Sequence, residues 1–317
     1  MTDKEKFQKT FDKLHASPDV LTEVLNMTTE KKIVPIRSFE NGKVDLPALR
    51  RMVELQIEGG TAAIVTCGTT GEPATMSADE REMVVRETVK AVNGRIPVIC
   101  GTGSNNTAAV VETERRYRDL GCAAQLVVTP YYNKTTQEGL YAHFMHIAEN
   151  TKLPIILYNV PGRTNLDLSA KTIGRLAECD RFIALKESSY DLPGVMEKMR
   201  AAAGRLTFYS GNDDMVYPML ALGFEGVISV MSNVKPRMMA DMVNAWFQGD
   251  HERSRDLQLN SLPLIRALFT EVSPIPCKYA MAQLGLCQNE LRLPLIPASE
   301  STCALMDAAL ETVKTYC

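Results

Sequence analysis

The sequence is poor in the residues that build metal centres and disulfide scaffolds. Its 317 residues include four histidines, one tryptophan and eight cysteines, and no pair of cysteines has C-x-x-C spacing. Several cysteines, among them Cys67 and Cys100, lie in apolar runs, where cysteine is usually a small buried hydrophobe. The composition therefore predicts a protein of a reducing compartment without a metal site.

Long apolar runs and blocks of like charge are also lacking. No apolar segment is long enough to span a bilayer, and residues 1–6 mix acids and bases without the apolar core of a signal peptide. The 35 basic and 38 acidic residues leave a net charge of −3 and form no basic block. We therefore expect a cytoplasmic protein that binds neither nucleic acid nor membrane.

No glycine-rich dinucleotide-binding motif follows an apolar run, because Gly101-Thr102-Gly103 is only a fragment of that pattern. The sequence has instead a repeating unit, in which short apolar runs alternate with stretches of helical periodicity. The eight runs are 33–36, 62–66, 97–101, 125–129, 154–158, 182–185, 206–209 and 226–230. The helical stretches between them include 46–58, 78–92, 107–120, 139–149 and 169–177.

Strand-then-helix modules of this size are βαβ units, which join parallel strands. Eight of them predict an α/β fold, a closed (β/α)8 TIM barrel over residues 29–235, in preference to an open doubly wound sheet. Residues 236–317 contain helical patterns without strands and predict a C-terminal helical appendage. Residues 1–28 predict a short N-terminal helical extension.

Groups suited to catalysis follow the predicted strands. In a (β/α)8 barrel the reactive groups lie on the loops after the carboxyl ends of the strands. Hydroxyls, phenols, an arginine and a lysine should therefore meet at one mouth. The segments that carry them are 68–72, 129–133, 158–164, 186–189 and 210–214.

Lys186 stands at the end of the apolar run 182–185. Burial disfavours the charged ammonium form, and a neutral amine can condense with a ketone to form a Schiff base. Threonine and tyrosine hydroxyls can relay the protons of that reaction, while an arginine or glycine-rich backbone can hold a carboxylate. Each group alone is equally explained as a solvated side chain, a turn or a packing residue. Together they predict a site for a 2-keto acid.

Four stretches at the predicted strand ends form a specific combination: Gly68-Thr69-Thr70-Gly71-Glu72, Val128-Thr129-Pro130-Tyr131-Tyr132-Asn133, Tyr158-Asn159-Val160-Pro161 and Leu185-Lys186-Glu187. With them the chain resembles the dihydrodipicolinate synthase and N-acetylneuraminate lyase family of class I aldolases, from residue 33 to about 300. The Thr69–Thr70 pair and Arg163 favour the synthase branch of that family over the lyase branch.

The resemblance implies a role for each catalytic residue. Lys186 would form an imine with pyruvate, and Tyr158 beside it would transfer protons, linked through Thr69 to Tyr132. In the family this second tyrosine comes from a neighbouring subunit, so the resemblance implies a homodimer or homotetramer.

The resemblance also implies the binding residues and the reaction. Thr70 would hold the pyruvate carboxylate, Arg163 would hold the carboxylate of L-aspartate-4-semialdehyde, and Gly211 and Ile228 would surround the lysine. The two substrates would condense through the Schiff base, in the pathway of diaminopimelate and lysine biosynthesis. No metal or organic cofactor is implied.

Two other readings stay open. A different pyruvate-dependent aldolase, of the N-acetylneuraminate lyase or 2-keto-3-deoxy-sugar-acid type, would share Lys186 and Tyr158, whereas Arg163 favours a short carboxylate substrate. A non-catalytic barrel would be expected to lack one of the catalytic residues, and none is missing.

His143 and His146, spaced i, i+3, could form a metal pair, but packing or solvated histidines explain them better.

The sequence departs from the family pattern in three places. The first strand runs into Pro35-Ile36-Arg37 where the family usually has a Thr-Pro pair, and we have no physical account of this change. The 28-residue extension has no counterpart in shorter members. The third departure lies in the family's site for inhibition by L-lysine.

We predict weak or absent inhibition by L-lysine. Asn105 and Tyr131 fit the family's inhibitor site, but Ala109 stands where sensitive members have a glutamate, and Ala78 and Arg81 replace polar or histidine positions. Without the glutamate the ammonium group of lysine lacks its partner, which costs about 1–3 kcal/mol. Assays with increasing lysine test this, and strong inhibition at sub-millimolar concentrations would contradict it.

Overall fold

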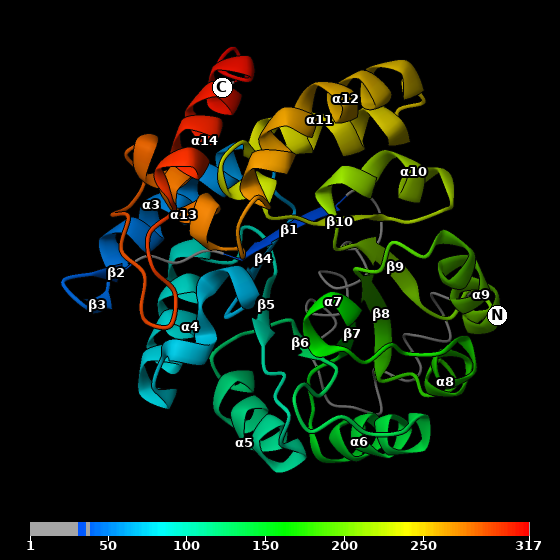
Figure 1. Ribbon diagram of the computed structural model, residues 1–317. Helices are drawn as coiled ribbons and strands as arrows, with labels where there is room; N and C mark the ends of the chain where they lie inside the picture. Colours follow the sequence, from blue (N-terminus) through cyan, green and yellow to red (C-terminus); the bar gives the residue numbers. More distant parts are fainter. Residues whose placement is uncertain (1–30, 36–38, 317) are drawn as a thin grey trace.

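The computed structural model describes residues 31–35 and 39–316. Within them, eight parallel strands form a closed barrel in the order β1-β10-β9-β8-β7-β6-β5-β4, as predicted (Figure 1). The predicted N-terminal helices and the residues Ile36 and Arg37 lie outside the described part. The strands are β1 (Lys31–Pro35), β4 (Ala63–Thr66), β5 (Val98–Gly101), β6 (Ala124–Val128), β7 (Ile155–Asn159), β8 (Phe182–Glu187), β9 (Thr207–Ser210) and β10 (Gly226–Ile228).

The strands are short apolar runs because both of their faces are covered. Inward-facing side chains such as Val65, Ile99, Leu126 and Ala184 fill the barrel, while outward-facing ones pack against the helices. Most strand bounds differ from the predicted runs by one or two residues. One difference matters for function: β8 continues through Lys186 and Glu187, which the prediction placed after the strand.

The helices surround the barrel as an outer ring (Figure 1). Local caps set where they begin: the Ser77 hydroxyl accepts a hydrogen bond from the Glu80 amide at 3.1 Å, and the Glu80 carboxylate accepts one from the Ser77 amide at 3.0 Å. The bounds predicted for α3 and α4 agree with the structure. The ring helices are α3 (Leu46–Glu58), α4 (Ala78–Val92), α5 (Thr107–Arg118), α6 (Gln137–Asn150), α8 (Ala170–Leu176), α9 (Leu192–Ala202), α10 (Val216–Ala221) and α11 (Pro236–Phe247).

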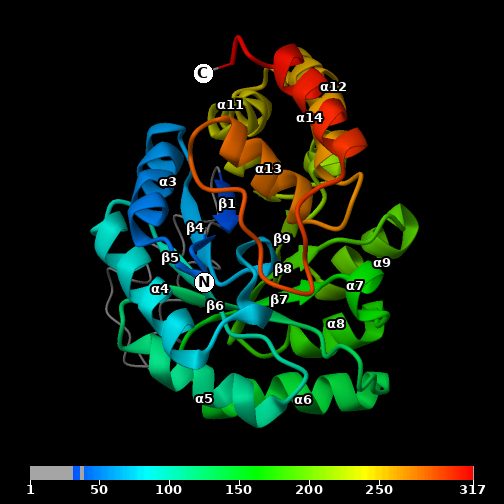
Figure 2. The ribbon, with the colours of Figure 1, turned by 60° about the vertical axis from the view of Figure 1, so that its left-hand side comes forward.

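Further helices, α12 (His251–Leu268), α13 (Ile275–Gln283) and α14 (Glu300–Thr312), pack to one side of the barrel beside α11 (Figure 2). They share one apolar core with α3 and α4, to which Met52, Val85, Leu264 and Met306 belong. The boundary at 235/236 between barrel and appendage stays a prediction. Within the described residues, no helix is long and apolar enough to cross a membrane.

Short elements complete the described fold. A two-stranded antiparallel ribbon, β2 (Phe39–Glu40) with β3 (Lys43–Val44), precedes α3. One short helix, α7 (Pro161–Thr164), follows β7, and the 3-10 turns are η1 (Thr69–Gly71), η2 (Pro73–Thr75), η3 (Asp213–Met215) and η4 (Met231–Asn233). Both η1 and α7 follow barrel strands at their carboxyl ends, where the predicted site lies.

The two histidines of α6 lie in different environments. His143 is buried, and its Nδ1 lies 2.9 Å from the Thr107 hydroxyl, whereas His146 is exposed. Burial lowers the pKa of His143 to about 4, and the nearby His146 adds to the effect. Their different surroundings favour a packing role for His143, and the described residues contain no group of three or more potential ligands that could hold a metal.

We predict that acid destabilises the fold through His143. Because its pKa is about 4 when folded and 6.5 when unfolded, the unfolded chain binds more protons between these values. The free energy of unfolding should therefore fall by about 1–2 kcal/mol between pH 7 and pH 5 through this residue. His143→Gln should flatten that slope in urea unfolding, while the exposed control His146→Gln should keep it. Equal slopes in the wild type and His143→Gln would contradict this.

Candidate active site

Seven of the eight predicted site residues line one small cavity at the carboxyl ends of the barrel strands. The cavity measures about 90 Å³ and also contacts Ser188, Asn212, Phe269 and Ser273, which the sequence did not single out. Its predicted members come from five segments that are distant in the chain, so the barrel alone brings them together. They are Thr69, Thr70, Tyr158, Arg163, Lys186, Gly211 and Ile228.

Lys186 lies at the floor of this cavity. Its residue is 8% exposed, and its Nζ atom lies 4.2 Å from the centre of the Tyr158 ring. Strand register explains this pairing, because Lys186 on β8 stands opposite Tyr158 on β7 and Tyr209 on β9. The amine therefore lies between two aromatic neighbours, above the apolar interior of the barrel.

The next residue, Glu187, points the other way and fixes β8 to its surroundings. Its carboxylate is fully buried and accepts hydrogen bonds from Lys198 Nζ at 3.0 Å and from Asn159 Nδ2 at 2.9 and 3.0 Å. Asp167 completes the network at 2.7 Å from Lys198 Nζ. Removing one partner of a buried pair costs about 3–5 kcal/mol, so this network holds the strand that carries Lys186.

A second buried carboxylate, Asp213, lies near the lysine and shapes the following loop. It accepts hydrogen bonds from the backbone amides of Val230 and Met231 at 3.0 and 2.7 Å. Burial raises the pKa of Asp213, and hydrogen bonds from Ser229 and these amides oppose that effect, as does the charge of Lys186. Asp213 therefore caps the loop that follows β10.

Gly211 is required by close packing beside the lysine. A Cβ atom at this position would lie 2.9 Å from Lys186 Cε and 1.9 Å from Ser188 Oγ. Any larger residue would displace both side chains, which explains why glycine follows β9 here.

Arg163 lies on α7 and faces the region above the lysine. Its Nη2 donates a hydrogen bond to the Ser273 carbonyl oxygen at 3.0 Å. The guanidinium also lines an adjoining chamber of about 350 Å³ together with Arg81, Tyr131 and Pro294. The chamber and the cavity adjoin, because Thr69, Tyr158 and Arg163 line both.

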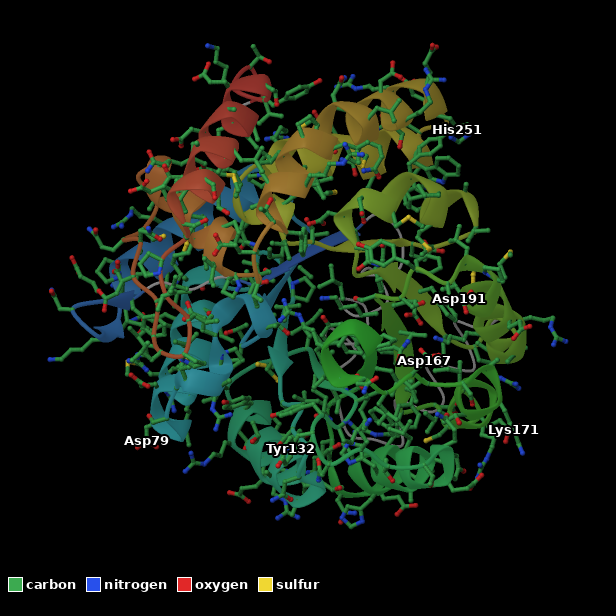
Figure 3. All side chains as sticks on the ribbon, viewed as in Figure 1. Asp79, Tyr132, Asp167, Lys171, Asp191 and His251 are labelled. Atoms are coloured by element: carbon green, nitrogen blue, oxygen red, sulfur yellow. The ribbon has the colours of Figure 1, made fainter. Side chains whose placement is uncertain are left out.

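Tyr132 is the one predicted residue that lies apart. Its side chain is 94% exposed and lines neither cavity, and it lies toward the helical ring, away from the centre of the barrel (Figure 3). Its backbone φ of 70° is in the left-handed region, which is costly for a bulky residue. Within one chain, Tyr132 therefore lies apart from the cavity that Thr69 and Tyr158 line.

Proteins of one family match this chain over nearly its whole length. The sequence profile of the Dihydrodipicolinate synthetase family matches residues 33–313. The 4-hydroxy-tetrahydrodipicolinate synthase of Pelobacter propionicus is 44% identical over 277 residues, 87% of this chain and 96% of the relative. That of Acetivibrio thermocellus is 47% identical over 281 residues, 89% of this chain and 94% of the relative.

The solved structures agree with the sequence relatives. The chloride-inhibited dihydrodipicolinate synthase from Acinetobacter baumannii, in complex with pyruvate, superposes with a TM-score of 0.88 at 40% identity. The match covers 90% of this chain and 99% of that protein. By its barrel, by the residues of its cavity and by these matches, the chain belongs to the dihydrodipicolinate synthetase family.

Proposed function

We propose that the chain condenses pyruvate with L-aspartate-4-semialdehyde through a Schiff base on Lys186, the reaction of 4-hydroxy-tetrahydrodipicolinate synthases. The observation that carries the proposal is the cavity itself, in which a buried amine lies 4.2 Å from the Tyr158 ring and shares the space with Thr69, Thr70 and Arg163. The pyruvate in the Acinetobacter relative supports the first substrate. A cytoplasmic location is part of the proposal.

The first steps follow from the cavity's groups. The amine of Lys186 attacks the C2 atom of pyruvate, whose carboxylate binds Thr70 and the neighbouring backbone amides of η1. The Tyr158 hydroxyl supplies a proton to the carbinol oxygen, which leaves as water, and the imine forms. Loss of a proton from the pyruvate methyl group then gives an enamine. A phenol suits this relay because it passes protons without holding a charge.

The enamine carbon attacks the aldehyde of the second substrate and forms the new carbon–carbon bond. Arg163 holds that substrate's carboxylate, and the substrate's own amine then displaces Lys186 as the ring closes. A sugar-acid aldolase would use the same lysine but needs neutral donors and acceptors where Arg163 stands. The names of the sequence relatives support the synthase over that alternative.

We infer that a second copy of the chain supplies Tyr132. Tyr132 is 94% exposed, adopts a left-handed backbone conformation and lines neither cavity of its own chain. Placed across an interface, its hydroxyl would extend the relay of Thr69 and Tyr158 toward solvent. A homodimer is then the smallest complete unit, and a homotetramer is a pair of such dimers.

We predict that pyruvate and borohydride leave a reduced adduct on Lys186 alone. Peptide mass mapping locates it, and assays with L-aspartate-4-semialdehyde test turnover. Lys186→Arg should remove the adduct and nearly all turnover, since a guanidinium does not form an imine. Lys152→Arg, at an exposed loop, is the matched control and should change neither.

An adduct without turnover of the aldehyde would contradict the second substrate and favour another pyruvate aldolase. No adduct on Lys186 would contradict the proposal as a whole.

We predict that two inactive variants restore each other's activity when mixed. Lys186→Ala keeps Tyr132, and Tyr132→Phe keeps Lys186, so a mixed dimer has one complete site if Tyr132 acts across the interface. Random mixing makes half the dimers mixed, which should return roughly a quarter of wild-type activity. Refolding the two variants together and assaying turnover checks this. No recovery, in mixtures shown to contain mixed dimers, would mean that Tyr132 serves its own chain.

A further inference from the structure

A buried ion pair joins the C-terminal helical region to the loop that carries Thr69 and Thr70. Lys278 on α13 lies 2.6 Å from a carboxylate oxygen of Glu72, and both side chains are 2% exposed. The two residues are 206 positions apart. The loop after α13 reaches the barrel helices α3 and α4, since the Leu286 carbonyl accepts a hydrogen bond from Arg51 and Arg292 binds Glu80 (Figure 1).

The pair belongs to a larger clamp on this loop. The Lys278 Nζ also donates to the Glu290 carbonyl at 3.0 Å, and the second Glu72 oxygen accepts the Arg292 amide at 3.3 Å. The Arg292 guanidinium binds both oxygens of Glu80, at 2.8 and 2.5 Å, and the Thr75 carbonyl at 2.9 Å. The C-terminal segment therefore holds the loop at Glu72, at Thr75 and at the first turn of α4.

The Glu72–Lys278 pair of this clamp is shielded from water. The buried Phe39 ring lies 4.9 Å from Lys278 Nζ and 4.2 Å from the Arg292 guanidinium carbon. A cation over an aromatic face is attracted to it, and the apolar cover strengthens the ion pair beneath.

Glu72 is coupled directly to the groups that face the cavity. It follows η1 in the chain, and its amide donates to the Thr69 carbonyl at 3.1 Å. Its φ of 51° is in the left-handed region, which glutamate adopts only when its surroundings hold it there. A shift of Glu72 must therefore move Thr69 and Thr70.

We propose that Glu72 and Lys278 are positioning residues for the pyruvate carboxylate, acting through Thr69 and Thr70. The inference rests on the proposed function, because those threonines bind pyruvate only in that reaction. It gives the C-terminal helical region a part in catalysis: α13 sets the position of a loop on the opposite side of the cavity from Lys186. A loop displaced by even 1 Å costs up to about a hundredfold in rate.

The test separates positioning from stability with the variants Glu72→Gln, Lys278→Met and the double variant. Each single change leaves a partner buried without its counter-charge and should lower the melting temperature, whereas the double change removes both charges and should restore most of it. The pyruvate concentration that half-saturates formation of the borohydride-trapped adduct should rise about tenfold in the double variant, because the ion pair that fixes residue 72 is absent. Leu264→Ala in α12, a buried core change, should lower the melting temperature without that rise.

A double variant that regains both wild-type stability and wild-type pyruvate dependence would overturn the positioning role and leave only a structural one. So would Leu264→Ala raising the half-saturating pyruvate concentration as much as the double variant does. If the wild type itself forms no adduct, the proposed function fails instead. If the wild type forms the adduct and the double variant shows the same pyruvate dependence as the wild type, then only the positioning inference fails.

Discussion

An amine at the edge of an apolar barrel interior is the constraint on which this structure depends. Alternation along β8 turns Lys186 inward and Glu187 outward, so one short strand supplies both the reactive group and its anchor. The anchor is ionic, because Glu187 is fully buried and pairs with Lys198 of α9 at 3.0 Å. Lys186 therefore faces Tyr158, and the carboxylate on its own strand, Glu187, is not its counter-ion.

Among the described residues, the acids near the cavity are held by hydrogen bonds or ion pairs. Glu72, the acid nearest the carboxylate-binding loop, is paired with Lys278, so it does not repel an anionic substrate. Asp213 is bound by two backbone amides. Arg163 lies on the wall and donates to the Ser273 carbonyl, and its guanidinium can also bind a carboxylate. These arrangements make a small cavity that favours anions around a buried amine.

The sequence predicted much of this fold because strand and helix periods are local signals. The repeating apolar runs predicted all eight barrel strands, and the strand-end rule brought Lys186, Tyr158 and Arg163 to one mouth. Pairings between distant residues could not be predicted, since nothing near Glu72 indicates Lys278 as its partner. The extent of β8 was also missed, because two charged residues look like the end of a buried strand. Tyr132 faces outward, and the sequence of one chain does not show which residues of another chain its side chain would contact.

The most direct test of the account is a crystal structure of the enzyme treated with pyruvate and borohydride. The account predicts continuous density from Lys186 Nζ to the C2 atom of pyruvate, with the carboxylate against Thr69 and Thr70 and the Tyr158 hydroxyl beside the adduct. Density at another lysine, or a pyruvate bound in the cavity without a bond to Lys186, would contradict it.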